Sequence, residues 1–358
     1  MEHDNRATGS IKNSADDFIV DEVPLYEPSG VGSHLYVRFR KRGLTTDFVV
    51  RGFAQALGVS ARDIGVAGLK DKIAVTTQTI SIPVPPREPA GDFEQRVRSV
   101  AIDGVDILDA RLHANKLKTG HLTGNRFDLV IRDIAPTDIA RVVARFEEIA
   151  RDGVPNAFGE QRFGMRGDNA DVALKWLRDG GPGPRDARQR RFLWSALQSA
   201  IFNDVLDRRV ADGTWHRAIA GDLLVKHDSG AVFLCADESV DSERAARGEV
   251  SATGPMAGVD MRKPEGAPHA IEEAVEQKYL GPTFDWAATR TLGAGARRPL
   301  RLWVKEVEAS ANTYSGPEGG DSPIIGASMR VKFMLPKGGY ATTVLSSVLR
   351  IVEANDSA

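Results

Sequence analysis

Residues 33–82 change their hydrophobic period twice, and this constrains the fold more than any other feature of the chain. The first segment alternates apolar and polar side chains as a half-buried strand does, with Leu35, Val37 and Phe39 set against Tyr36, Arg38 and Arg40. A helix is predicted next, capped by Thr45 or Thr46 and ended by Gly58, with apolar positions at Phe48, Val49, Phe53 and Leu57. Residues 75–82 are again β-prone. A strand, a helix, a loop and a second strand therefore follow one another.

The loop of this stretch carries Gly65 and Gly68, followed by the triplet Lys70-Asp71-Lys72. Two neighbouring ammonium groups favour an ionised carboxylate, which can act as a nucleophile or a base. The glycines allow the backbone to approach a ligand closely. A Lys-Asp-Lys triplet is also typical of a solvated surface turn, so charge alone does not distinguish the two interpretations.

Two further basic stretches are candidates for RNA contacts. Residues 111–127 contain Arg111, His113, Lys116, Lys118, His121 and Arg126 and end in Asn125-Arg126-Phe127. This pattern suits phosphate contacts that lead to a hydrogen-bonded and stacked base, although taken alone such a stretch is more often a solvated hairpin. Residues 185–194 place four arginines before Phe192 and Trp194, a basic helix start that has no specificity as a signal.

The remaining periodicity predicts a mixture of helices, strands and loops. Apolar positions from Thr137 onward fit one helical face that ends at Gly153 and Pro155, where we place a domain boundary. Further helices are predicted at 169–178, 192–210 and 341–352, strands at 126–131, 297–307 and 329–335, a hairpin at 227–230, and solvated loops at 241–249 and 310–322.

Composition limits the classes of function. A chain of 358 residues with 42% apolar side chains suits two domains, and a net charge of −2 means that any RNA surface is a local patch. The single cysteine, Cys235, excludes an internal disulfide and is expected to be a small buried hydrophobe. Neither metal-ligand spacing nor a nucleotide-binding fingerprint is found, so we expect no metal and no cofactor. With no apolar run of about 18 residues, a soluble, cytoplasmic monomer without membrane contact is expected.

A series of short motifs runs in a fixed order along nearly the whole chain. They include Asp17-Phe18-Ile19-Val20-Asp21-Glu22, Gly68-Leu69-Lys70-Asp71-Lys72, Lys116-Leu117, Gly124-Asn125, Gly153-Val154-Pro155-Asn156, Phe158-Gly159-Glu160-Gln161-Arg162-Phe163-Gly164, Gly221-Asp222 and Thr253-Gly254-Pro255. In content and order this series resembles the TruD family of tRNA pseudouridine synthases, whose bacterial members modify uridine 13.

The resemblance implies an α+β fold of two domains. A pseudouridine synthase catalytic domain with a mostly antiparallel mixed sheet would be discontinuous, comprising residues 1–152 and 299–358. A smaller α/β insertion domain of the TruD type would comprise residues 153–298, with RNA in the cleft between the domains.

The resemblance also assigns site residues. Asp71 falls at the catalytic aspartate, and Phe18, Asn125 and Phe127 fall where the family contacts the target nucleotide. Tyr340 stands where the family commonly has phenylalanine, and its hydroxyl needs a partner if it is buried. The basic residues expected to contact RNA are Lys12, just upstream of Phe18, and Lys116.

The implied reaction isomerises uridine in tRNA, with position 13 as the expected target. It breaks the N1–C1′ bond, turns the base and joins C5 to C1′, which needs no redox partner or metal. Asp71 either attacks C1′ or removes a sugar proton, and the sequence does not choose between these.

Two other functions compete with this one. A catalytically silent RNA-binding protein or RNA chaperone would keep the fold, but the intact motif around Asp71 argues against it. A carboxylate-dependent glycosidase or nucleosidase normally requires a second acid, and Glu160 or Asp222 would have to meet Asp71 in space.

Overall fold

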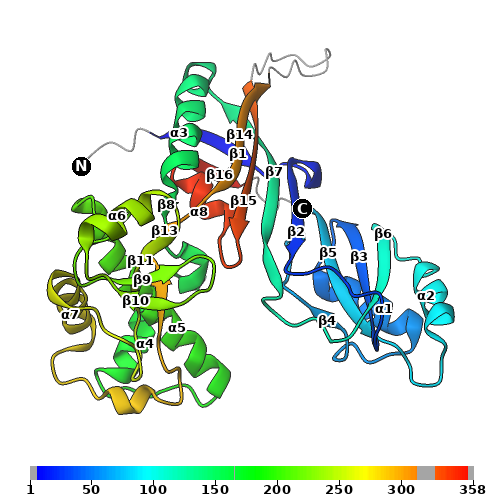
Figure 1. Ribbon diagram of the computed structural model, residues 1–358, viewed down its shortest axis with the longest axis horizontal. Coiled ribbons are helices and arrows are strands. Elements are labelled where there is room, and N and C mark those ends of the chain that lie inside the picture. Colours follow the sequence, from blue (N-terminus) through cyan, green and yellow to red (C-terminus); the bar gives the residue numbers. More distant parts are fainter. Residues whose placement is uncertain (1–5, 165, 313–326, 354–358) are drawn as a thin grey trace. The chain divides into compact units, whose positions relative to one another are not determined.

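The computed structural model describes residues 6–164, 166–312 and 327–353 (Figure 1). Within it the chain forms two compact units, one comprising Met1–Arg151 with Val304–Ala358 and the other comprising Asp152–Trp303. Helices and mostly antiparallel strands are mixed in both units, so the predicted α+β class is confirmed.

A mixed sheet forms the centre of the first unit. Its strands are β1 (Ala7–Ile11), β2 (Phe18–Pro24), β3 (His34–Arg42), β4 (Gly65–Val66), β5 (Val75–Pro83), β6 (Val105–His113), β7 (Leu122–Ile134), β14 (Lys305–Asn312), β15 (Ala327–Pro336) and β16 (Leu349–Glu353). The main order is β14-β15-β7-β2-β5-β3-β6, and strands β1, β16 and β4 are attached to it. Only the β2–β5 and β1–β16 pairs are parallel among the described pairings, which places the start of β2 beside the start of β5.

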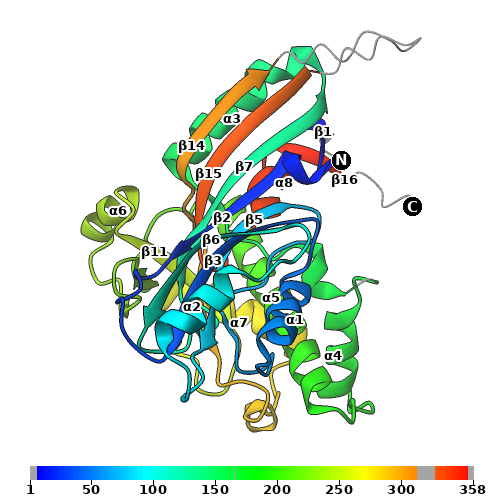
Figure 2. The ribbon, with the colours of Figure 1, turned by 90° about the vertical axis from the view of Figure 1, so that its right-hand side faces the viewer.

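The helices of this unit are η1 (Ala15–Asp17), α1 (Thr46–Leu57), α2 (Ala90–Arg98), η2 (Pro136–Asp138), α3 (Ile139–Asp152) and α8 (Ala341–Ser346). Figure 2 shows α3 running alongside β14, β15 and β7. Helix α1 begins as predicted, because the Thr45 hydroxyl accepts a hydrogen bond from the Phe48 amide, and it ends at Gly58 with φ 68°. Phe48 itself is 49% exposed and does not belong to the buried face. That face packs Val49, Phe53 and Leu57 against β3 and β5.

Several predicted elements were wrong. Residues 341–352 do not form one helix, because α8 ends at Ser346 and β16 pairs in parallel with β1. Residues 241–249 are not a loop, because α6 (Glu238–Ala246) begins where the Asp237 carboxylate accepts a hydrogen bond from the Val240 amide. This helix is short and mostly solvated, which explains its polar sequence. Of the predicted loop 310–322, residues 310–312 belong to β14 and the rest lie outside the described residues.

The second unit combines helices with a four-stranded sheet in the order β10-β9-β11-β12 and a two-stranded sheet of β13 and β8. Besides α6, its elements are β8 (Val154–Pro155), η3 (Glu160–Phe163), α4 (Asn169–Leu177), α5 (Ala187–Ala211), β9 (Leu223–Lys226), β10 (Val232–Leu234), β11 (Val250–Met256), α7 (Gly266–Leu280), η4 (Trp286–Thr289), β12 (Ala296–Pro299) and β13 (Arg301–Leu302). The strand predicted at 297–307 is therefore three strands, since the first ends at Pro299. Cys235 is buried in this unit's core, as predicted.

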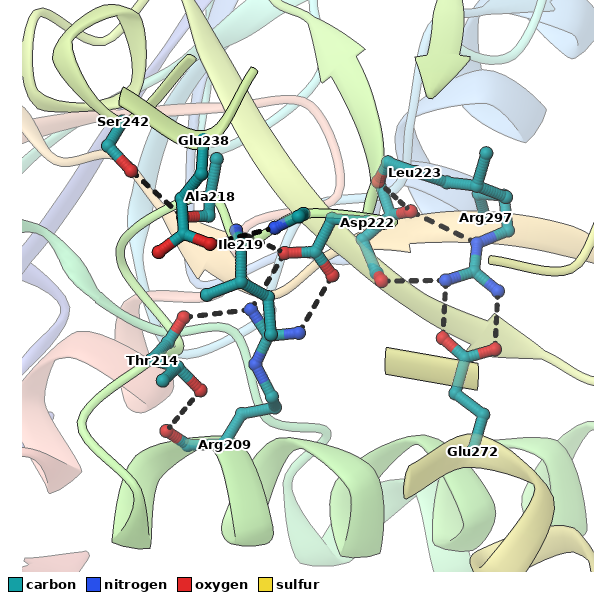
Figure 3. Close-up of polar contacts among 12 residues, drawn as sticks. Arg209, Thr214, Ala218, Ile219, Asp222, Leu223, Glu238, Ser242, Glu272 and Arg297 are labelled. Atoms are coloured by element: carbon teal, nitrogen blue, oxygen red, sulfur yellow. Dashed lines mark hydrogen bonds and ion pairs between the residues drawn. The ribbon is translucent and has the colours of Figure 1, made fainter. Parts of the chain in front are cut away.

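Buried ion pairs cross-link the second unit (Figure 3). Two guanidinium nitrogens of Arg209 donate to the two carboxylate oxygens of Asp222 at 2.8 and 2.9 Å. Arg297 makes the same two-pronged contact with Glu272 at 2.8 and 2.6 Å. Burial raises the pKa of Glu272, and the Arg297 guanidinium opposes that shift.

Candidate active site

Two buried lysines fix the backbone of the loop at residues 67–74, which carries Asp71 between β4 and β5. Lys41, near the end of β3, is fully buried, and its Nζ donates to the carbonyl oxygens of Asp71 and Leu44 at 2.7 and 2.6 Å. Lys70 donates through Nζ to the Glu22 carboxylate on β2 at 2.8 Å, and both of these side chains are buried. The Lys41 ammonium thus holds the Asp71 carbonyl, and the Lys70 ammonium ties the neighbouring residue to β2.

The threonine at the start of α1 holds the same loop from another side. The Lys70 amide donates to Thr46 Oγ1 at 3.0 Å, and this hydroxyl donates to Gln78 Oε1 on β5 at 3.1 Å. The second oxygen of Glu22 accepts a hydrogen bond from the Thr79 amide at 3.2 Å. The loop is therefore tied to α1, β2 and β5.

Burial also determines the charge state of Lys41. It lowers the pKa of the Lys41 ammonium to about 8, because the charged form loses its hydration. The Asp71 charge opposes this shift and the Lys70 charge adds to it. The Lys41 ammonium that holds the Asp71 carbonyl thus loses its proton at a pH well below that of an exposed lysine.

The carboxylate of Asp71, in contrast, faces solvent. It is 59% exposed, and Lys12 Nζ lies 3.3 Å from its Oδ2. The same ammonium lies 4.9 Å from the centroid of the Phe18 ring, within the range of a cation–π contact. Lys12 has a backbone φ of 59°, which is uncommon for a residue other than glycine. Residues with such backbone angles cluster at functional sites. Lys12, Phe18 and Asp71 therefore form one cluster.

Phe18, Asn125 and Phe127 share one face of the sheet. In the register of β2 and β7, Val20 pairs with Phe127 and Glu22 pairs with Asn125, and residues two apart on a strand point the same way. The Phe18 and Phe127 rings lie edge to face at 6.3 Å, and Phe127 stacks on Phe333 of β15 at 5.3 Å. Both Phe18 and Phe127 are largely buried, at 3% and 8% exposure. These two rings form an aromatic pair, Phe18 and Phe127, beside the Lys12–Asp71 pair.

The amide of Asn125 contains an unsatisfied acceptor. Its Oδ1 is buried, and no hydrogen-bond partner within the described chain reaches it. A buried polar atom left in this state costs about 1–3 kcal/mol. A ligand that offers an N–H or O–H donor at this face would recover that free energy.

Tyr340 and Lys116 are the other two predicted residues. Tyr340 is 57% exposed at the start of α8, so its hydroxyl needs no internal partner. Lys116 lies in the loop between β6 and β7, where its Nζ donates to the Arg62 carbonyl at 2.8 Å. The structure thus brings Lys12, Phe18, Asp71 and Phe127 together and gives Lys116 different neighbours.

Sequence reasoning missed the supporting residues Lys41, Glu22 and Thr46. One signal for Lys41 was present, because it continues the alternating phase of Val37 and Phe39 and so had to point into the buried side of β3. A lysine on a buried face needs polar partners, which here are backbone carbonyls.

Asp222, one of the two candidates for a second acid, is already fully engaged. It is 1% exposed, pairs with Arg209 and also accepts a hydrogen bond from the Ile219 amide at 3.0 Å (Figure 3). Glu160 lies at the start of η3 in the second unit.

Across the described ranges, no three His, Cys, Asp or Glu side chains gather as metal ligands would. In the same ranges no helix has the length and apolarity needed to cross a membrane.

Comparison with known proteins identifies the family. The model of the family described as tRNA pseudouridine synthase D (TruD) matches residues 1–180 and 186–348. A tRNA pseudouridine synthase D from Anaeromyxobacter sp. (strain Fw109-5) is 42% identical, over 96% of this chain and 93% of its own length. One from Thermus thermophilus is 40% identical, over 97% of this chain and 90% of its own length.

A solved structure agrees with these relatives. The crystal structure of the putative tRNA pseudouridine synthase D from Methanosarcina mazei superposes with a TM-score of 0.74 at 25% identity, covering 96% of this chain and 94% of that one. A match along almost the whole length in sequence and in fold leaves one assignment, and the chain belongs to the TruD family.

Proposed function

We propose that this protein isomerises uridine to pseudouridine in tRNA, at position 13, with Asp71 as the catalytic carboxylate. The observation that carries the proposal is the position of Asp71, whose exposed carboxylate sits on a backbone held by buried lysines and pairs with Lys12 above the Phe18 ring. The relatives of this protein that bear the name tRNA pseudouridine synthase D match nearly the whole chain. An intact catalytic cluster in such a chain favours an isomerase over a silent RNA-binding protein.

The arrangement suits the chemistry of this isomerisation. The target base leaves its stack, and the Phe18 and Phe127 rings form a surface on which it rests while Asn125 Oδ1 accepts the uracil N3–H. The Asp71 carboxylate then reaches the sugar, where it either displaces uracil N1 from C1′ to form a sugar ester or removes a sugar proton as the N1–C1′ bond breaks to form a glycal. In both routes the N1–C1′ bond breaks, C5 of the turned base bonds to C1′, and C5 then loses its proton. Lys12 keeps the carboxylate aligned, since it contacts both Asp71 and Phe18.

The two units take different tasks in this proposal. Residues 1–152 and 299–358 form the catalytic domain, and residues 153–298 form the insertion domain that recognises the shape of the tRNA. The exposed Tyr340 ring offers a further stacking surface for RNA, and Lys116 offers a cation. The protein acts in the cytoplasm as a monomer, with no cofactor.

Incubation with unmodified tRNA transcripts, followed by mapping of pseudouridine, tests the proposal directly. The wild-type chain should form pseudouridine at position 13, and the Asp71→Asn variant should form none while still binding the transcript. Binding without any pseudouridine from the wild-type chain would favour the silent RNA-binding protein instead. Release of free uracil would favour a nucleosidase.

A further inference from the structure

A second exposed site lies at the other end of β2 from Phe18. It is a groove of about 510 Å³ whose lining includes Tyr26, just after β2, His113 at the end of β6, and His121 just before β7. Because β2 rises about 3.3 Å per residue, the end of the strand that leads to the groove lies roughly 20 Å along the backbone from Phe18. It is therefore distinct from the cluster around Asp71.

Aromatic rings form a prearranged stack in this groove. The rings of Tyr26 and His113 are stacked, with centroids 5.1 Å apart and planes 20° apart. The Tyr26 hydroxyl hydrogen-bonds with His121 Nδ1 at 2.8 Å, and the Ser29 amide donates to His113 Nδ1 at 3.2 Å. The Tyr36 ring packs against His113 at 4.6 Å. Because the rings are already ordered, a flat ligand can stack on them at little cost in conformational entropy.

The polar groups around the rings favour a nucleotide over a bare anion. Lys116, Lys118 and the amide of Asn115 also line the groove, and such groups bind phosphate. Glu27 lines it too, and its carboxylate repels an anion but accepts N–H donors from the edge of a base. Stacked rings, a carboxylate and flanking lysines together match an unpaired nucleotide with its backbone phosphate.

The groove is physically joined to the loop that carries Asp71. The Gly120 amide donates to the Ala67 carbonyl at 2.8 Å, and the Leu117 amide donates to Ser81 Oγ on β5 at 2.8 Å. A Cβ on Gly65 would lie 2.2 Å from the Leu117 carbonyl oxygen, so the two loops pack without space for a side chain. A ligand bound in the groove would therefore contact a loop that is hydrogen-bonded to the backbone leading to Asp71.

We infer that this groove binds an unpaired nucleotide of the tRNA, a few nucleotides from the target uridine. The base stacks on the Tyr26–His113 pair, and its phosphate contacts Lys118. The inference rests on the proposed function, since the RNA is the same molecule that carries the target.

The test compares two variants that both lose the Tyr26 hydroxyl. Tyr26→Phe keeps the ring and Tyr26→Leu removes it, and each is made in the Asp71→Asn chain so that binding is measured without turnover. By fluorescence anisotropy with a labelled tRNA transcript, Tyr26→Leu should bind roughly 5- to 100-fold more weakly than Tyr26→Phe. Lys118→Ala should reduce the slope of log affinity against log salt by about 0.7, the value for one phosphate of a single strand. Lys332→Ala, whose lysine pairs with Glu308, should leave that slope unchanged.

Equal affinities for the two Tyr26 variants, with matched thermal unfolding, would overturn the inference. If Tyr26→Leu does not fold, His113→Ala takes its place, and wild-type affinity there has the same meaning. If the wild-type chain binds tRNA but forms no pseudouridine, the proposed reaction is wrong. The tRNA affinities of the two Tyr26 variants would still show whether the groove binds a nucleotide. If neither the wild-type chain nor the Asp71→Asn chain binds tRNA, both the proposed function and the inference are wrong.

Discussion

Asp71 and Asp222 are both aspartates within family motifs and both pair with a cation, yet their surroundings are opposite. Asp222 is 1% exposed, and its two oxygens are taken up by Arg209 and the Ile219 amide. Asp71 is 59% exposed, and a single lysine lies 3.3 Å from one of its oxygens. The first carboxylate is buried and therefore out of a substrate's reach, whereas the second is exposed to solvent. Environment, and not residue type, separates a structural carboxylate from a reactive one.

The contrast continues beneath the surface of the first unit. The Lys70–Glu22 pair under Asp71 resembles the Arg209–Asp222 pair, since both are buried and hydrogen-bonded to backbone amides. The carboxylate that we propose to be reactive is thus exposed, and the pair that supports it resembles a buried pair of the other unit. We expect substitutions at the exposed group to change catalysis, and substitutions at the buried pairs to change stability.

The largest effect should come from Asp71→Asn. This change should lower kcat by about 10⁴-fold, because the amide cannot act as nucleophile or base. Since the side chain is exposed, the free energy of unfolding should change by less than about 0.5 kcal/mol. Single-turnover pseudouridine formation and urea denaturation measure the two quantities. A variant that retains more than a tenth of the activity would remove Asp71 from the chemistry.

Asp222→Asn should do the reverse. Breaking a buried ion pair leaves Arg209 without its counter-charge and should destabilise the second unit by about 3–5 kcal/mol. Thermal unfolding should occur roughly 10 °C lower. The double variant Arg209→Met with Asp222→Leu should recover most of this loss, because no charge is then buried. If the single variant unfolds at the wild-type temperature, the pair is not a structural support.

Lys41 should give the site a basic limb in its pH profile. The buried ammonium holds the Asp71 carbonyl and has its pKa lowered to about 8, so kcat should fall as pH rises through that value. Lys41→Met should show roughly 10- to 100-fold lower kcat and no such limb, because the loop is misplaced at every pH. A limb of the same shape in Lys41→Met would assign the titration to another group.

The contribution of Lys41 to the stability of the fold should change with pH in the direction opposite to kcat. The pKa of Lys41 lies below its ordinary value of 10.5, so between about pH 8 and that value the unfolded chain binds a proton that the folded chain does not. The contribution of Lys41 to the free energy of unfolding therefore rises with pH over this window. Urea denaturation of wild type and Lys41→Met across it isolates that contribution.

The smallest effect on turnover should come from substitution in the aromatic pair of Phe18 and Phe127. Phe127→Ala would open a cavity beneath the sheet and cost about 3–5 kcal/mol, so Phe127→Leu is the better test. It should reduce kcat/KM by roughly 2- to 10-fold through lost stacking. Phe93→Leu, at a fully buried ring on α2, is the matched control and should weaken stability without changing kcat/KM. Equal turnover in the two variants would remove Phe127 from the site.

The sequence by itself determined the elements whose signals are local. The alternation in β3, the Thr45 cap and Gly58 stop of α1, and the glycine-bearing loop before β5 all lie within a few residues of the features they specify. The motif around Asp71 was equally readable, because it is contiguous.

Only the tertiary structure decided the rest, because the deciding contacts join residues far apart in the chain. Leu349–Glu353 form β16 because β1 offers them a parallel partner, and no periodicity within residues 341–352 records that partner. In the same way, folding brought Lys12 to the Asp71 carboxylate and Lys41 to its carbonyl, and it buried Asp222 against Arg209. Sequence identifies which carboxylates are candidates, but hydration and hydrogen-bond partners decide which one remains free to react.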